Sequence, residues 1–262
     1  MNMETLAQTL DCGQCFRWNR LPDGSWDGMA CGRHLRITEK NLPAVLDDGF
    51  WAGYFDMGLD YGGIRKRFCT MDPALARAAR YAPEMRILNQ DPWEALCSFI
   101  LSQCNNIKRI KGMVSRLCAE FGRPVEEGRR AFPAAETLAA AREEDLRALG
   151  CGFRAAYVLD AARKVASGEI NLEKVRRMPL EDARAKLAGI RGVGPKVADC
   201  ALLYGLHRLD AFPMDVWMKR VMQTLFPGKK PAWFGPYAGI AQQYLFHYGR
   251  NHPELFRGKR NQ

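Results

Sequence analysis

Lys196 and Asp215 are the two residues whose types and positions best fit covalent chemistry. Lys196 directly follows Gly194-Pro195, and proline favours the first helical position, so Lys196 is predicted to lie in a helix's first turn. A cation is unfavourable at that end of the helix dipole, and glycines and apolar residues surround it. We therefore expect the neutral amine to be favoured, the form that acts as a nucleophile. The alternative, a solvated surface charge, stays open.

Asp215 directly precedes a predicted helix over 216–225. An aspartate there is typical of an N-cap, and hydrogen bonds from the helix N-terminus keep its carboxylate ionised. The same carboxylate can stabilise a cationic transition state near Lys196. The capping role and the chemical role are compatible.

The segment 180–206 is predicted to form a helix, a tight glycine turn and a second helix. Pro179 and the acids after it begin the first helix, and Gly189, Gly192 and Gly194 permit a sharp turn before Lys196. Unpaired N–H groups at a helix N-terminus bind anions, so Gly192 and Gly194 are predicted to contact a phosphate. Two glycines alone also fit a simple turn.

The composition favours a polyanionic partner. The chain has 262 residues, a formal net charge of +10 and 47% hydrophobic residues. It has no apolar run of membrane-spanning length and no basic, apolar secretory pattern at its N-terminus, so we expect a soluble intracellular protein without membrane contact. Basic charge alone does not identify nucleic acid as the partner.

The nine cysteines are an odd number, which favours free thiols in an intracellular protein. Cys12 and Cys15 have the spacing of a redox or zinc half-site, but no second pair with ligand spacing follows. We therefore expect no metal or redox chemistry there. No cysteine lies beyond Cys200.

The fold class is predicted to be α+β, with a small N-terminal antiparallel β-sheet domain and a mostly helical body. Residues 1–80 alternate strand and turn signals, with strands expected over 14–18, 26–31 and 34–38. Residues 81–262 have helical periodicity and contain the helix–turn–helix segment. The active site is expected in a cleft of that body.

The segment around Lys196, together with Pro213-Met-Asp215, resembles the helix-hairpin-helix and Gly-Pro-Asp signature of base-excision DNA glycosylases. Gly13-Gln-Cys-Phe-Arg-Trp18 and Tyr54–Tyr61 resemble segments of 8-oxoguanine DNA glycosylases. The resemblance implies a bifunctional DNA glycosylase/AP lyase that flips the base out, forms a Schiff base on Lys196 and cleaves the strand by β-elimination. It also implies no iron–sulfur cluster, because the C-terminal four-cysteine loop of related branches is absent.

The resemblance further assigns a base pocket. The Gly13 carbonyl would accept the N7 proton that distinguishes 8-oxoguanine from guanine, and a Cβ there would obstruct the base. The purine would lie between Cys200 and Phe246, and Gln242 would read its Watson–Crick edge. Gln242 and Phe246 are one helical turn apart and share a face. Phe246 as an ordinary core residue is the alternative.

Four residues are assigned to the opposite strand by the same resemblance. Asn105 and Arg109 lie in a segment resembling one that enters the duplex, although Cys104 replaces its first asparagine. Phe153 would wedge into the stack and Arg154 would read the estranged cytosine. An arginine at a helix start also fits phosphate or solvent contact.

The expected partner is double-stranded DNA containing 8-oxoguanine, bound by a monomer, in the cytoplasm or nucleoid if the source is bacterial. No cofactor is expected to be required. The resemblance adds a structural Na⁺ or K⁺ on backbone carbonyls near Gly189, Arg191 and Gly194. Two alternatives remain: a monofunctional alkylpurine glycosylase, which has no use for Lys196, and a non-enzymatic helix-hairpin-helix DNA-binding protein, which needs neither Lys196 nor Asp215.

Overall fold

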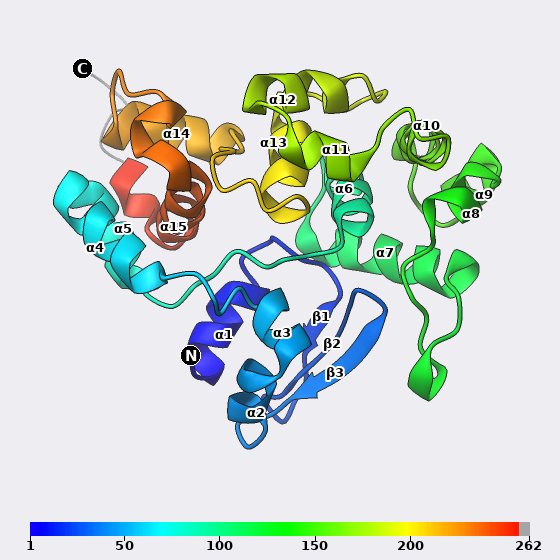
Figure 1. The fold of residues 1–262 in the computed structure, drawn as a ribbon, viewed down its shortest axis with the longest axis horizontal. Helices are drawn as coiled ribbons and strands as arrows, with labels where there is room; N and C mark the ends of the chain where they lie inside the picture. Colours follow the sequence, from blue (N-terminus) through cyan, green and yellow to red (C-terminus); the bar gives the residue numbers. More distant parts are fainter. Residues whose placement is uncertain (257–262) are drawn as a thin grey trace.

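The computed structural model describes residues 1–256. A small sheet with three helices lies below two groups of helices in Figure 1, and the chain passes from the sheet to the left group, then the right, and back. The sheet is antiparallel with strand order β1-β2-β3. The N-terminal elements are α1 (Met3–Leu10), β1 (Trp18–Arg20), β2 (Trp26–Ala30), β3 (Arg33–Ile37), α2 (Leu42–Asp47) and α3 (Gly49–Tyr54).

The sheet is held by an aromatic core of its own. Trp18 is fully buried and its indole N–H donates to the Tyr54 hydroxyl at 2.9 Å. Trp18 pairs with Gly28 across β1 and β2, where a Cβ would come within 2.4 Å of the indole. The predicted small antiparallel sheet is therefore confirmed, and glycine at 28 makes room for the tryptophan.

The predicted strand over 14–18 is wrong in all but its last residue, because β1 begins at Trp18. Gly13 has a φ of +88°, which turns the chain away from an extended path. Gln14 is fully buried and hydrogen-bonds through its side chain to the backbone of Thr9, Arg86 and Leu88. These side-chain bonds take the place of a strand ladder.

The body of the molecule is helical, as predicted. Asp91 caps the helix that starts at Pro92, and Asn106 caps the helix that starts at Ile107. Its elements are α4 (Tyr61–Met71), α5 (Pro73–Tyr81), α6 (Pro92–Leu101), α7 (Ile107–Phe121), η1 (Glu126–Gly128), α8 (Ala135–Ala139), α9 (Glu143–Ala148), α10 (Arg154–Ala166), α11 (Leu172–Arg177), α12 (Leu180–Ala188), α13 (Pro195–Tyr204), α14 (Val216–Leu225), η2 (Pro231–Tyr237), α15 (Ala238–Asn251) and η3 (Pro253–Phe256).

Two hydrophobic clusters form the core. The smaller one contains the aromatic residues of the sheet and α3, and the larger one joins α4 to α15. Phe68 of α4 and Leu75 of α5 belong to the larger cluster, and α5 packs on α15. A domain boundary near residue 80 thus remains a proposal, since α4 and α5 share a core with the C-terminal helix.

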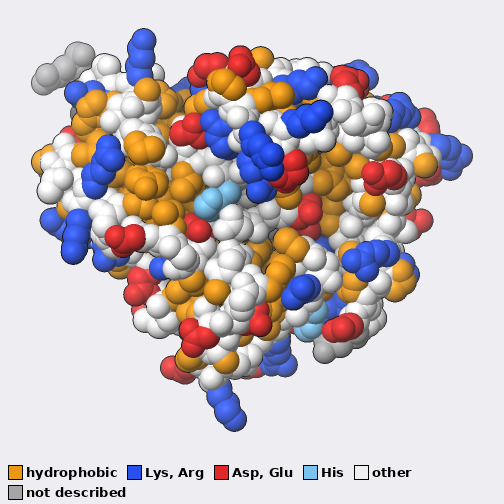
Figure 2. Space-filling model, in the orientation of Figure 1, with side chains coloured by type: hydrophobic (Ala, Val, Ile, Leu, Met, Phe, Trp, Pro, Cys, Tyr) orange, Lys and Arg blue, Asp and Glu red, His pale blue; other side chains and the backbone are white. Residues whose placement is uncertain are grey.

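The surface carries its basic charge in more than one place. Lysine and arginine side chains gather over the region of α11 to α13 on the face drawn in Figure 2, and others are spread along its rim. Among the described residues, no helix is both long and apolar enough to cross a membrane.

Candidate active site

The hairpin predicted from the glycines is formed by the turn between α12 and α13. Gly192 has a φ of +76°, and a Cβ there would lie 2.3 Å from the ring of Tyr157, so only glycine fits. Gly194 is the N-cap residue of α13 and Pro195 occupies the first helical position. Lys196 consequently lies in the first turn of α13, as predicted.

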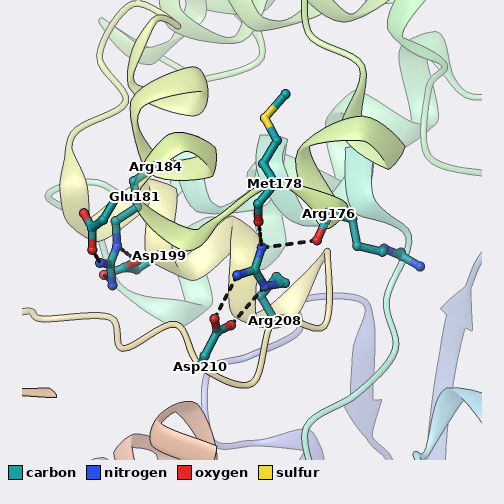
Figure 3. Close-up of polar contacts among 7 residues, drawn as sticks. All are labelled: Arg176, Met178, Glu181, Arg184, Asp199, Arg208 and Asp210. Atoms are coloured by element: carbon teal, nitrogen blue, oxygen red, sulfur yellow. Dashed lines mark hydrogen bonds and ion pairs between the residues drawn. The ribbon is translucent and has the colours of Figure 1, made fainter. Parts of the chain in front are cut away.

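Two ion pairs hold α13 and the chain that follows it. Arg184 of α12 donates to Asp199 of α13 at 2.6 Å, and Arg208 donates to the Met178 carbonyl at 2.6 Å while pairing with Asp210 (Figure 3). Burial raises the pKa of the Asp199 carboxyl, and Arg184 opposes that effect. The contacts tie α13 and the chain beyond it to α12 and the segment before it.

Lys196 lines a narrow pocket of about 60 Å³ between α6, α13 and α15. Its side-chain nitrogen Nζ is 5.5 Å from the centre of the Phe99 ring, which itself stacks on Tyr204 with ring centres 5.1 Å apart. Six predicted residues meet in this pocket, and four others complete it. The predicted ones are Gly13, Lys196, Cys200, Asp215, Gln242 and Phe246; the others are Cys12, Phe99, Tyr204 and Pro213.

Cys200 lies one turn after Lys196 on the same face of α13. Burial raises the pKa of its thiol to about 11, while the charge of Lys196 and a hydrogen bond with it act in the opposite direction. The thiol is therefore neutral near pH 7. An uncharged, polarizable sulfur beside the amine suits contact with an aromatic base rather than nucleophilic chemistry.

Asp215 caps α14, as predicted. Its Oδ1 accepts the Met218 backbone N–H at 2.7 Å. The residue lines both the narrow pocket and a wide cleft that opens from it, and Lys196 lines the same two spaces. The carboxylate is thus held by the helix N-terminus and faces the space beside the lysine.

Gln242 is 3% exposed, and its amide orientation is set by two partners. Its Nε2 donates to the Pro213 carbonyl at 3.2 Å, and its Oε1 accepts from the Tyr204 hydroxyl at 3.3 Å. The Tyr204 hydroxyl also contacts the Gln243 side-chain oxygen, so its single proton serves one of the two glutamines at a time. Buried polar groups held by such hydrogen bonds keep a fixed orientation, which a side chain that recognises a specific ligand needs.

Gly13 forms one edge of the pocket. A Cβ at this position would meet only Ile107 Cδ1, at an ordinary distance of 3.6 Å, so the protein itself leaves room for a side chain. The positive φ of +88° is what demands glycine within the protein. Any obstruction of a base by a side chain here remains a prediction.

The wide cleft has a volume of about 740 Å³ and runs between the start of α7 and the starts of α13 and α14. Asn105 lines it, with its Oδ1 accepting the Asn106 N–H at 3.0 Å and its Nδ2 donating to the Leu101 carbonyl at 3.2 Å. Cys104 lines it too, exposed and with a φ of +49°. Arg109 is exposed on α7.

Phe153 and Arg154 differ sharply in exposure. The Phe153 ring is 46% exposed and packs edge-on against Tyr157. Arg154 is only 6% exposed; its Nε donates to the Gln103 carbonyl at 2.7 Å and its guanidinium also reaches the Cys104 carbonyl at 3.1 Å. The arginine therefore holds the 103–104 loop and is not displayed on the surface.

Sequence reasoning missed Phe99, Tyr204, Pro213 and Cys12 as pocket residues. Phe99 and Tyr204 match helical core patterns, and nothing in their spacing points to a pocket. Pro213 and Cys12 are each close in sequence to a predicted site residue, Asp215 and Gly13 respectively. Proximity to those residues was the only available signal.

Two of the three hairpin carbonyls suggested for a monovalent cation already accept hydrogen bonds. The Gly189 carbonyl accepts the Lys164 ammonium at 2.6 Å, and that ammonium is also 3.1 Å from Asp160. Asp160 in turn accepts the Arg191 N–H at 2.7 Å. The Gly194 carbonyl accepts a backbone N–H of α13. A lysine ammonium thus already satisfies one of the proposed ligands.

The described residues contain no group of three or more histidine, cysteine, aspartate or glutamate side chains placed to hold a metal ion. All nine cysteines are free thiols, and Cys12 and Cys15 are both buried. Burial raises the pKa of the Cys12 thiol to about 12. Neither thiol is activated for redox chemistry.

Comparison with known proteins gives consistent matches along the chain. Residues 2–96 match the family described as 8-oxoguanine DNA glycosylase, N-terminal domain, and residues 97–232 match the HhH-GPD superfamily base excision DNA repair proteins. The N-glycosylase/DNA lyase of Saccharomyces cerevisiae is 40% identical over 258 residues, covering 82% of this chain. This chain spans 66% of the length of that relative.

Solved structures agree with the sequence matches. MBOgg1 in complex with a low affinity DNA ligand is 42% identical, with a TM-score of 0.84 over 94% of this chain and 92% of that one. The Clostridium acetobutylicum 8-oxoguanine glycosylase/lyase, in complex with double-stranded DNA containing cytosine opposite 8-oxoguanine, is 34% identical. Its TM-score is 0.83, over 95% of this chain and 92% of that one.

Proposed function

Because the chain belongs to the HhH-GPD superfamily of base excision DNA repair proteins and carries the 8-oxoguanine DNA glycosylase N-terminal domain, we propose that it is a bifunctional DNA glycosylase/AP lyase. Its substrate would be 8-oxoguanine in duplex DNA. The observation that carries the proposal is the convergence of Lys196, Asp215 and four predicted base-contacting residues on one pocket.

The damaged nucleotide must leave the duplex before its sugar can be attacked, at a cost of roughly a few kcal/mol. The cleft of about 740 Å³ would admit the extruded nucleotide, and the narrow pocket at its base would take the purine. Phe153 would replace the lost stacking in the duplex, since its ring is exposed. Asn105, Arg109 and Arg154 would contact the opposite strand, and Gly192 and Gly194 a phosphate.

Lys196 would supply the nucleophile. The neutral amine attacks C1′ as the bond from C1′ to the base breaks, and the bonding electrons leave with the purine. Asp215, held by the N-terminus of α14, stabilises the positive charge that develops on the sugar. The attached amine loses a proton and the C1′–O4′ bond opens, with O4′ taking up a proton, which gives the imine. Removal of a proton from C2′ then breaks the bond to the 3′ oxygen by β-elimination, and the 3′ phosphate leaves with the bonding electrons.

Gly13, Cys200, Gln242 and Phe246 would recognise the base. The Gly13 carbonyl would accept the N7 proton of 8-oxoguanine, while guanine, with a lone pair at N7, would meet repulsion. One such contact supplies on the order of 1–3 kcal/mol. Gln242 presents an amide of fixed direction to the base edge, and Cys200 and Phe246 flank the plane of the ring.

Borohydride trapping tests the proposal directly. The wild-type protein should form a covalent adduct with a duplex that contains 8-oxoguanine opposite cytosine, because reduction fixes the imine. Lys196→Gln should abolish the adduct while retaining affinity for the same duplex. An adduct of undiminished yield with Lys196→Gln, or no adduct with the wild type, would refute the assignment.

A monofunctional alkylpurine glycosylase is the second candidate, and it differs in needing no amine. Such an enzyme would release base without trapping and without strand cleavage. Lys196 lies in the pocket beside Cys200 and Phe99, which supports the lyase, because the lyase requires an amine there and the monofunctional reaction with water does not.

The hairpin cation is not part of the proposal. Lys164 already donates to one of its suggested carbonyl ligands, so no step depends on the ion. We propose a monomer that acts on chromosomal DNA, which in a bacterial cell means the cytoplasm and nucleoid.

A further inference from the structure

Gln90 bridges two parts of the pocket that are far apart in the sequence. It lies just before α6, and its Nε2 donates to the Gln14 carbonyl at 2.7 Å and to the Tyr204 carbonyl at 3.2 Å. A primary amide nitrogen carries two hydrogens, so these two bonds use both of them. One bond reaches the loop of Gly13 and the other reaches α13.

The bond to Tyr204 satisfies a carbonyl that the helix leaves free. Tyr204 is the last residue of α13, and the final carbonyls of a helix have no partner within it. Lys196 is in the first turn of the same helix, and the Tyr204 ring lines the pocket. Lys196 lies at the opposite end of α13, where the hairpin holds it, so the bond from Gln90 fixes the Tyr204 end of the helix and with it the base pocket.

The bond to Gln14 acts on the residue next to Gly13. The Gln14 side chain is fully buried, with its Nε2 donating to the Arg86 carbonyl at 2.8 Å and its Oε1 accepting the Leu88 N–H at 2.9 Å. The segment 86–90 therefore holds both the side chain and the carbonyl of Gln14. Gly13 has little freedom to move apart from this segment.

We propose that Gln90 is a positioning residue that sets the separation between the Gly13 carbonyl and α13, and so determines selectivity for 8-oxoguanine over guanine. This inference rests on the proposed function. A hydrogen bond weakens steeply as its distance and angle depart from the optimum. A shift of the loop that contains Gly13 would therefore weaken the hydrogen bond between the Gly13 carbonyl and N7–H of 8-oxoguanine. An abasic site has no base to read, and its cleavage needs only the amine and the carboxylate.

Two substitutions separate positioning from folding. Gln90→Glu keeps the shape but points an oxygen without hydrogens at two carbonyl oxygens. Gln90→Met removes the hydrogen bonds while retaining a side chain of similar length. Gln223→Glu, on the exposed side of α14, is the matched control for the added charge.

The experiment measures single-turnover excision of 8-oxoguanine and of guanine opposite cytosine, together with cleavage of an abasic site in the same duplex. Gln90→Glu and Gln90→Met should lower the 8-oxoguanine rate by about tenfold or more and reduce its ratio to the guanine rate. Cleavage of the abasic site should stay within about threefold of wild type. Gln223→Glu should leave all three rates near wild type.

Equal loss of 8-oxoguanine excision and abasic-site cleavage in both variants would overturn the proposal, as would an unchanged ratio of 8-oxoguanine to guanine. Thermal unfolding, measured for each variant, identifies one that fails to fold. If that variant is Gln90→Glu, the rates of Gln90→Met decide whether the proposal holds. If wild-type protein gives no borohydride adduct at all, the proposed function fails, which is a different outcome from either of these.

Discussion

The two walls of the cleft differ in how firmly their side chains are held by hydrogen bonds and burial. On the pocket wall, Asp215 caps a helix, Gln242 has partners at both ends of its amide, and Cys200 is 3% exposed. On the opposite wall, Cys104 is exposed with a left-handed backbone. The Phe153 ring, outside the cleft and next to Arg154, which binds the 103–104 loop, is 46% exposed. Chemistry is proposed for the first wall and duplex reading for the second.

The difference follows from what each wall must do. A nucleophile and a charge-stabilising group act only when their geometry is fixed before the substrate arrives. A wedge and an opposite-base reader meet a duplex that itself deforms, so part of their order can form on binding. Arg154 illustrates this, because in the proposed role it would have to release the Gln103 and Cys104 carbonyls to reach a base.

Asp215→Asn should give the largest effect of the variants that test this contrast. Asparagine caps a helix as well as aspartate does, so α14 should stay intact while the negative charge is lost. We expect excision of 8-oxoguanine to slow by about a hundredfold to a thousandfold, with the dissociation constant for duplex DNA changing little. Single-turnover kinetics and a binding titration measure the two quantities.

Asp60→Asn is the matched control, since Asp60 caps α4 through the Gly63 N–H outside both pocket and cleft. It should leave the excision rate near that of the wild type. A loss of DNA affinity in Asp215→Asn as large as its loss of rate would indicate that the carboxylate has only a structural role.

Gly192→Ala should have the next largest effect, because this residue joins the hairpin before α13 to the ring pair of Tyr157 and Phe153. A Cβ would lie 2.3 Å from the Tyr157 ring, and Tyr157 packs under Phe153 with ring centres 5.8 Å apart. Overpacking together with the left-handed φ should lower the free energy of unfolding by about 1–3 kcal/mol. Affinity should fall for undamaged and damaged duplexes alike, because hairpin contacts do not read the base.

Gly194→Ala distinguishes steric crowding at residue 192 from a general effect of replacing a hairpin glycine with alanine. Gly194 has an extended backbone, and no atom lies within 4 Å of a Cβ built there. Its unfolding free energy should change much less than that of Gly192→Ala. Similar destabilisation of the two variants, measured by denaturant titration, would contradict the proposed crowding by Tyr157.

The local features of the pocket wall could be predicted from the sequence because short-range signals determine them. Glycines and Pro195 specify the hairpin, and an aspartate before an apolar helix specifies the Asp215 cap. The alternation over 14–18 predicted a strand wrongly. In the structure the Gln14 side chain instead hydrogen-bonds to the backbone of Arg86 and Leu88. Residue spacing alone does not reveal this long-range contact.

Pocket residues contributed by distant segments could not be predicted in the same way. Phe99 reaches Lys196 only because α6 packs on α13, and Lys164 reaches Gly189 only because α10 lies beside the hairpin. The inward direction of Arg154 likewise depends on the path of the 103–104 loop. These contacts depend on tertiary packing, which periodicity does not encode.

Cys104→Asn should have the smallest effect and tests the opposite wall alone. At a φ of +49° asparagine is better tolerated than cysteine, so the free energy of unfolding should rise by about 0.5 kcal/mol. An amide facing the cleft can also hydrogen-bond where a thiol does so poorly. We expect the ratio of excision opposite cytosine to excision opposite adenine to rise by about three- to tenfold.

Cys104→Ser is the comparison for this variant, because it changes the polarity without supplying an amide. Single-turnover rates on duplexes with each of the four bases opposite 8-oxoguanine measure the ratio, and abasic-site cleavage should remain unchanged in both variants. If Cys104→Asn raises stability but leaves the opposite-base ratio where it was, the 104–106 loop does not contact the opposite strand. Of the residues proposed near the 103–106 loop, only Phe153 and Arg154 would then contact the duplex.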